Sequence, residues 1–316
     1  MGVKAEEFKK SEISLPKAEE FVHDVIDIHV HGPDNIPRRY NPDGAELASE
    51  QGRIAGIVLK SHLRKDMVSI AKRVTKLTKG ILKAFGSLTL NDGFNARDVY
   101  DVRKKAGDKP FFIWGPTVAA RSFLESIKGD YAIPESWVKG SSFSPIRKDT
   151  FRPVSCLNKK NKLTKESLDV LKVMSGTKGI LASGHLSGEE THILGIEACK
   201  RDVPFIATHS LLGERSPLNG QQMRELTMRG AWLEFCYIFL KDEDWDGKYN
   251  RKQIVTQIRK YISRAVVSSD CGQIRNMPPS SCMAECVRLL SAYGLTKKEL
   301  QILTIDNPRK ILGLYR

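Results

Sequence analysis

Two histidines, one residue apart, stand at the end of a short apolar run near the start of the chain. The run reads Val-Ile-Asp-Ile-His-Val-His over residues 25–31, and a Gly-Pro pair follows it at once. In an extended strand alternate side chains share a face, so Asp27, His29 and His31 are expected to point the same way. Neutral imidazoles on a rigid strand are suitable ligands for a divalent metal. Two packed core histidines would give the same pattern. The metal-site interpretation therefore depends on whether other parts of the chain supply further ligands.

Three later apolar runs also end in residues of metal-binding type. They end in Ser-Gly-His, Thr-His-Ser and Ser-Ser-Asp sequences that contain His185, His209 and Asp270. If these runs are parallel strands, all of these side chains lie at the carboxyl ends, where α/β barrels place their catalytic residues. Each one alone could equally be a helix cap or a core residue. Four of the seven histidines at such places, in this order, indicate a metal site.

The strands that would carry these residues recur along the whole chain. Most β-branched apolar runs start roughly 24 to 35 residues apart, which is the length of one strand and one helix. We expect strands at residues 25–31, 55–62, 84–90, 111–118, 179–185, 203–209, 231–236 and 265–270. Their apolar character fits parallel strands buried on both faces. The chain is therefore predicted to be α/β, with a single TIM-type (β/α)8 barrel over residues 21–316.

Helix signals separate the runs. A helical pattern covers residues 65–79, and capping boxes at residues 187–190 and 296–299 begin two further helices. Residues 41–53 and 309–314 are also expected to be helical, whereas residues 1–20 form a polar leader. Residues 119–163, after the fourth strand, are too long for a simple connection. Such connections are often binding loops or lids, so we expect a long insertion over the carboxyl-terminal face.

Composition narrows the function classes. No apolar run approaches the roughly 20 residues that span a bilayer, and the start of the chain lacks a secretory-signal core, so we expect a cytoplasmic protein with no membrane partner. The net charge of +14 raises the question of nucleic acid, but no aromatic-interleaved basic motif accompanies it. We therefore expect a small-molecule substrate and no nucleic acid, and leave a homo-oligomer open. The six cysteines contain no C-x-x-C pair and are interpreted as free thiols.

The order of the candidate ligands resembles the amidohydrolase superfamily of metal-dependent hydrolases. Members carry Asp-x-His-x-His on the first strand, a histidine on the fifth and sixth, and an aspartate on the eighth. The resemblance runs from about Val25 to the end and includes a closing segment at residues 306–314. It implies one or two divalent metals among His29, His31, His185, His209 and Asp270. The fourth strand lacks the bridging lysine or glutamate of binuclear members, so one metal is preferred. Zinc is the first choice, with Mn, Fe, Ni or Co as alternatives, and a second metal is left open.

The resemblance also implies a chemistry. A metal-bound hydroxide would attack a small polar or anionic amide, cyclic amide, lactone or ester, with Asp270 as the general base that returns the proton to the leaving group. Substrate contacts are expected from Arg38, Lys60, His62 and Glu234. Lys60 would bind an anionic group or, if carboxylated, bridge metals; a solvated position at the rim is equally compatible. Two other functions stay open: a metal-dependent decarboxylase of the same fold, and a non-catalytic module that binds nucleic acid or another partner.

Overall fold

Parallel strands form the centre of the molecule in the computed structural model, which describes residues 13–32, 44–63, 67–140, 143–211, 218–241 and 250–314. One sheet contains, in order, β1 (Ile26–His31), β2 (Gly56–Lys60) and β3 (Lys83–Phe85). The second contains β11 (Ala265–Ser268), β10 (Trp232–Cys236), β9 (Phe205–Ala207), β8 (Gly179–Ala182), β5 (Phe111–Trp114) and β4 (Ser87–Thr89). Every pairing in these two sheets is parallel. The predicted α/β class is confirmed, and each predicted strand region contains a strand, with β3 and β4 sharing the third.

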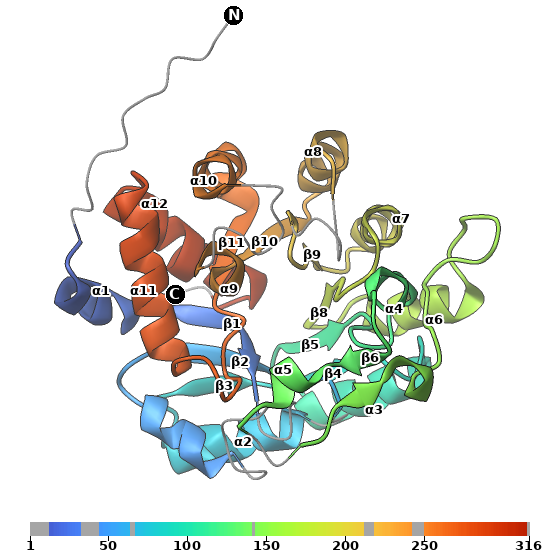
Figure 1. Ribbon diagram of the computed structural model, residues 1–316, viewed down its shortest axis with the longest axis horizontal. Helices are drawn as coiled ribbons and strands as arrows, with labels where there is room; N and C mark the ends of the chain where they lie inside the picture. The colour runs from blue at the N-terminus through green and yellow to red at the C-terminus, as the bar shows by residue number, and fades with distance from the viewer. Residues whose placement is uncertain are drawn as a thin grey trace, which may run out of the picture.

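Helices surround these strands (Figure 1). The long ones are α1 (Leu15–Val22), α2 (Met67–Leu77), α3 (Ala96–Ala106), α6 (Lys165–Met174), α7 (Gly188–Lys200), α8 (Gly220–Met228), α10 (Arg251–Lys260) and α11 (Pro279–Ala292). Shorter ones are α9 (Tyr237–Lys241), η3 (Ile262–Arg264), α12 (Lys297–Gln301), the π-helical η4 (Ile302–Asp306) and α13 (Asn307–Ile311). Both predicted capping boxes are confirmed, at the starts of α7 and α12.

One predicted helix is wrong in type. Residues 41–43 lie outside the described residues, and the segment that follows them forms the 3-10 helix η1 (Ala45–Glu50). The segment is six residues long. So short a segment gains few of the i to i−4 hydrogen bonds that offset the cost of nucleating an α-helix, and 3-10 geometry is common in short connectors.

The two sheets meet at two seams, one between β3 and β4 and one between β1 and the segment after β11. Together these give the strand order of an eight-stranded barrel. β3 and β4 are separated only by Gly86, where a Cβ atom would lie 2.2 Å from Val68 Cα of α2. Glycine therefore lets α2 approach closely, at the cost of a break in the third strand. At the other seam Val30 forms an isolated bridge with Cys271, and the His31 amide donates to the Cys271 carbonyl at 2.7 Å. The seams place β1 beside β11, so the two ends of the barrel sequence meet.

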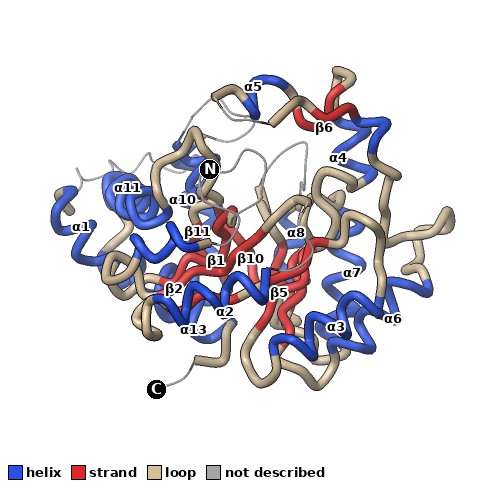
Figure 2. The backbone as a smooth tube through the Cα atoms, turned by 90° about the horizontal axis from the view of Figure 1, so that it is seen from below, coloured by secondary structure: helices blue, strands red, loops and turns tan. Residues whose placement is uncertain are grey.

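The chain between β5 and α6 forms a small unit of its own. It contains α4 (Arg121–Ser126), β6 (Tyr131–Ile133), α5 (Glu135–Val138), β7 (Ile146–Arg147) and η2 (Lys148–Thr150), with β6 and β7 antiparallel. Phe123, Ile133 and Val138 belong to a hydrophobic cluster separate from the main core. Figure 2 shows α4, β6 and α5 grouped at one end of the molecule, beyond the strands. A role for residues 119–163 as a lid stays a prediction.

Within the described ranges, no helix combines the length and the apolar character needed to span a membrane. The cytoplasmic location, the oligomeric state and the polar leader stay predictions from the sequence.

The capping box of α12 gives a prediction about stability. Thr296 Oγ1 accepts from the Glu299 amide at 3.2 Å, and Glu299 Oε2 accepts from the Thr296 amide at 2.8 Å. The change Thr296→Ala should lower the free energy of unfolding by about 1 kcal/mol in urea denaturation. The control Thr256→Ala removes an exposed hydroxyl within α10 and should cost less than about 0.5 kcal/mol. Equal costs for the two variants would contradict a capping role.

The same carboxylate gives a dependence on pH. A hydrogen bond from Arg259 to Glu299, at 2.7 Å, lowers the pKa of Glu299 below its ordinary value of 4.5. A depressed carboxyl pKa stabilises the fold above the unfolded pKa, and this stabilisation is lost as the pH falls through the folded pKa. The cost of Glu299→Gln in urea denaturation should therefore shrink as the pH is taken well below 4.5.

Candidate metal centre

Imidazoles form a closed ring at the carboxyl ends of the strands. The centroids of neighbouring rings are 5.6 Å apart for His29 and His31, 4.9 Å for His31 and His62, 5.9 Å for His62 and His185, 5.6 Å for His185 and His209, and 5.3 Å for His209 and His29. None of these residues is more than 7% exposed. The four histidines expected to bind metal are thus brought together, and His62, expected to contact substrate, completes the ring.

Asp270 lies against this ring. Its Oδ1 atom is 2.7 Å from His31 Nε2 and 3.2 Å from His29 Nε2, and its Oδ2 atom is 3.8 Å from His209 Nε2. Three imidazole nitrogens, two from β1 and one from the turn after β9, therefore converge on one carboxylate. Donor atoms of His29, His31 and Asp270 all lie within 4.8 Å of one another, close enough to hold a metal ion.

The turns after two strands give the site its shape. His209 and Asp270 both have left-handed backbones, with φ of 53° and 54°. Such values are uncommon for residues other than glycine and often occur at functional sites. Gly272 follows with φ of 113°, and a Cβ atom there would lie 2.1 Å from the His31 carbonyl oxygen. Glycine thus allows the segment after Asp270 to pass directly over the end of β1.

Burial favours the neutral form of three of these imidazoles. It lowers the pKa of His29 and of His62 well below the ordinary value, and that of His209 to about 3. Burial alone would raise the pKa of Asp270, but the electrostatic interaction with the His29 ring and the hydrogen bond with His31 outweigh it, so this pKa lies well below its usual range. Neutral imidazoles beside an ionised carboxylate are the protonation states that a divalent metal requires.

A buried lysine reaches the same place. Lys60, at the end of β2, is fully buried, and its Nζ lies 2.9 Å from His29 Nε2. It also lies 4.8 Å from the ring centroid of Trp114, the last residue of β5. The fourth strand thus contributes an indole to the site, whereas the lysine comes from the second strand. His62 Nδ1 lies 2.8 Å from Thr117 Oγ1, at the rim just beyond β5.

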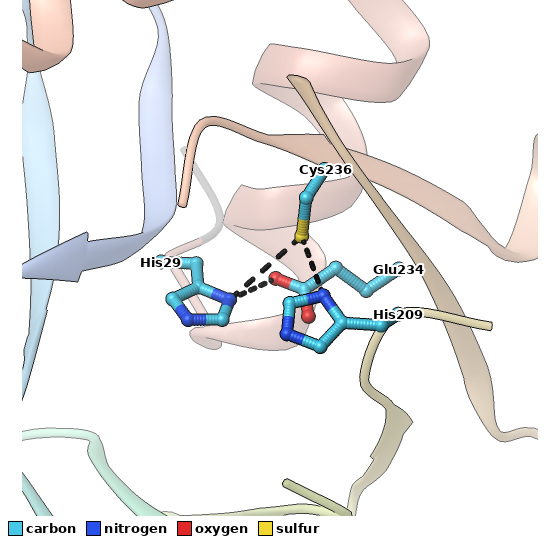
Figure 3. A group of neighbouring side chains, drawn as sticks. All are labelled: His29, His209, Glu234 and Cys236. Carbon is cyan, nitrogen blue, oxygen red and sulfur yellow. Dashed lines mark hydrogen bonds and ion pairs between the residues drawn. The ribbon is translucent and has the colours of Figure 1, made fainter. Parts of the chain in front are cut away.

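A second group of donors lies on the other side of two of these imidazoles. His29 Nδ1 is 3.1 Å from Glu234 Oε1, and His209 Nδ1 is 3.2 Å from Cys236 Sγ (Figure 3). Donor atoms of these four residues lie within 4.8 Å of one another. Sequence reasoning placed Glu234 at the substrate and missed Cys236. The available signal was their spacing, since residues two apart on a strand share a face.

Two other sequence expectations have different outcomes. Arg38, expected to contact substrate, lies outside the described residues. Asp27, expected on the face of His29 and His31, is absent from both metal-competent groups found among the described residues. The register of β1 shifts between Asp27 and Val30, so strict alternation fails there. Asp27 Oδ1 instead accepts from the backbone amides of His29 at 3.1 Å and Ser269 at 3.0 Å.

The interpretation of all six cysteines as free thiols is wrong for two of them. Cys271 and Cys282 form a disulfide, with Cα atoms 6.7 Å apart. Cys271 directly follows Asp270, and Cys282 lies on α11, which packs nearby, so the fold supplies a proximity that spacing alone does not reveal. Thiol titration of the denatured, unreduced protein should therefore find four thiols, and six after reduction. Six before reduction would show that this bond does not form.

Comparisons with known proteins agree with this architecture. A family model described as a family of unknown function, DUF6282, matches residues 24–234. No curated protein matches the chain. An amidohydrolase from Pseudomonas aeruginosa is similar in structure with a TM-score of 0.55 and 8% identity, over 94% of this chain and 99% of that one. A mutant of the organophosphorus hydrolase from Deinococcus radiodurans is similar with a TM-score of 0.52 and 13% identity. The match covers 97% of this chain and 99% of that one.

A third similar structure is named for a different activity. It is a Xaa-Pro dipeptidase, with a TM-score of 0.53 and 12% identity over 92% of this chain and 75% of that one. At such identities the likeness shows the fold. The predicted barrel architecture is therefore confirmed.

Proposed function

Because the chain belongs to DUF6282, a family of unknown function, we propose its function from the geometry of the site: it is a metal-dependent hydrolase of a small polar or anionic substrate. The observation that carries the proposal is the convergence of the Nε2 atoms of His29, His31 and His209 on the Asp270 carboxylate. The similarity of the fold to hydrolases supports it.

The donor set fits a divalent metal. The candidates to hold it are His29, His31, His185, His209 and Asp270. A metal at these residues would lower the pKa of a water molecule and polarise the bond to be cleaved. Zinc is the proposed ion, since several imidazoles with one carboxylate is a typical zinc donor set.

The chain's own residues would carry the proton and orient the substrate. Asp270, held ionised at neutral pH, would take a proton from water and deliver it to the leaving group. Lys60 is buried beside His29 and could place a substrate carboxylate or phosphoryl group against the ring of imidazoles. His62 stands at the rim between His31 and His185, where it could contact the same group.

The experiment combines metal analysis with a substrate screen. Freshly purified full-length protein should contain a stoichiometric divalent metal, with zinc in excess of other ions. The zinc-loaded protein is then tested against lactams, lactones, carboxylated amides, proline dipeptides and phosphotriesters in water enriched in oxygen-18. Hydrolysis should place the label in the product.

The other outcomes separate the competing functions. Release of carbon dioxide without label in the product would replace the proposal with a metal-dependent decarboxylase. Absence of bound metal, together with polynucleotide binding that weakens steeply with salt, would replace it with a binding module.

A further inference from the structure

A chain of hydrogen bonds lies behind His29 and His209, on the side away from Asp270. His29 Nδ1 is 3.1 Å from Glu234 Oε1, and Ser268 Oγ donates to the same oxygen at 2.7 Å. Cys236 Sγ is 3.2 Å from Ser268 Oγ and 3.2 Å from His209 Nδ1. Figure 3 shows Glu234 and Cys236 facing the two imidazoles. These residues are buried, with at most 3% exposed, so the chain is shielded from bulk water.

The direction of each hydrogen bond in this chain can be assigned by starting from the contact between Lys60 and His29. Lys60 Nζ lies 2.9 Å from His29 Nε2, and the assignment takes Lys60 as an ammonium group, which only donates. Nε2 therefore accepts, and the proton of the His29 ring lies on Nδ1, where it is donated to Glu234. Because the hydroxyl proton of Ser268 is also donated to Glu234, Ser268 Oγ accepts from the Cys236 thiol. The sulfur is then left to accept from His209 Nδ1.

We infer that Glu234, Ser268 and Cys236 are positioning residues that hold His29 and His209 as tautomers protonated on Nδ1. In this form the Nε2 lone pairs of both rings face Asp270, at 3.2 Å and 3.8 Å. Their role in catalysis rests on the proposed function, because the proposed metal would be held on the Nε2 side of both rings. Residues that fix the tautomer of a ligand typically change metal affinity by 10- to about 100-fold when removed.

The same atoms allow a competing arrangement. His29, His209, Glu234 and Cys236 could themselves bind a metal, and Glu234 Oε2 is buried with no hydrogen-bond partner in the part of the chain that the structure describes. That arrangement would use the Nδ1 lone pairs and therefore needs the opposite tautomer of both rings. The two arrangements are thus separated by where the ring protons lie and by whether sulfur contacts the metal.

The first measurement is made on the full chain without metal. Long-range proton to nitrogen-15 correlation spectra distinguish the two histidine tautomers. We expect Nδ1-protonated signatures for His29 and His209. Cys236→Val removes the acceptor and should move the His209 signals to the Nε2-protonated form, whereas Cys236→Ser should retain the wild-type pattern because a hydroxyl can accept from His209 and donate to Ser268. The control Cys199→Val, a half-buried thiol on α7, should leave the spectrum unchanged.

The second measurement adds metal. In competition with a chromophoric chelator, Cys236→Val should bind Zn²⁺ about 10-fold more weakly than wild type, and Cys236→Ser within about 3-fold of it. Cobalt-substituted wild type should lack a strong near-ultraviolet band from thiolate to cobalt. Such a band would show direct binding by Cys236 and would overturn the inference.

The two proposals fail separately. Nε2-protonated His29 and His209 in the metal-free wild type would overturn the positioning role while leaving metal-dependent hydrolysis intact. Nδ1-protonated rings in a protein that binds neither Zn²⁺ nor Co²⁺ would support the tautomer assignment and reject the proposed function.

Discussion

Replacement of Asp270 by asparagine should lower turnover by about 10²- to 10⁴-fold and leave zinc content near the wild-type value. Asparagine keeps the shape of the side chain and one oxygen atom, but it cannot take a proton from water at neutral pH. The imidazoles that converge on Asp270 remain in place, so metal should be retained. Turnover is measured on whichever substrate the screen identifies, and metal by elemental analysis of the same sample.

A matched control separates chemistry from backbone strain. Asp202 has a left-handed backbone like that of Asp270, with φ of 55° against 54°. It immediately precedes the segment leading to β9, at the opposite end of the strands from the imidazoles. Asp202→Asn should therefore leave turnover unchanged. Wild-type activity in Asp270→Asn would exclude Asp270 as the general base, and equal losses in both variants would point to the backbone instead.

The convergence of the candidate ligands could be predicted because it depends on a regular feature. Parallel strands in one barrel all end at the same rim, so polar residues after apolar runs meet there wherever they stand in the chain. His185 and His209 illustrate this, because only strand order was needed to bring them together. The α7 capping box was equally local, since Ser187 and Glu190 satisfy each other within one turn.

Other features depend on contacts that no local pattern encodes. Cys236 contacts Ser268 and His209 only because β10 lies between β9 and β11, and its register pairs Cys236 with Ser268. The Cys271–Cys282 bond likewise needs the packing of α11 against the end of β11. The displacement of Asp27 follows from a register shift within β1, which the alternation of side chains does not predict.

Replacement of His29 by alanine should abolish measurable turnover and weaken zinc binding by about 10²-fold or more. A structural zinc ion binds with about 10 to 16 kcal/mol in total, so the loss of one of about four ligands removes roughly 3 kcal/mol. His29 belongs to both metal-competent groups, with Nε2 toward Asp270 and Nδ1 toward Glu234. The same change leaves Lys60 and Glu234 buried without the imidazole between them, so folding is checked by circular dichroism. Zinc affinity is measured by chelator competition.

His192→Ala is the matched control, because His192 lies on α7 and pairs with Glu225 at 2.8 Å. It should keep full zinc affinity and full turnover. If folded His29→Ala binds zinc as tightly as wild type, the ion does not lie at β1, and the convergence on Asp270 that carries the proposed function has another cause. If affinity falls in His29→Ala alone, β1 holds the metal, and the chemistry of the site follows from the residues at the ends of its neighbouring strands.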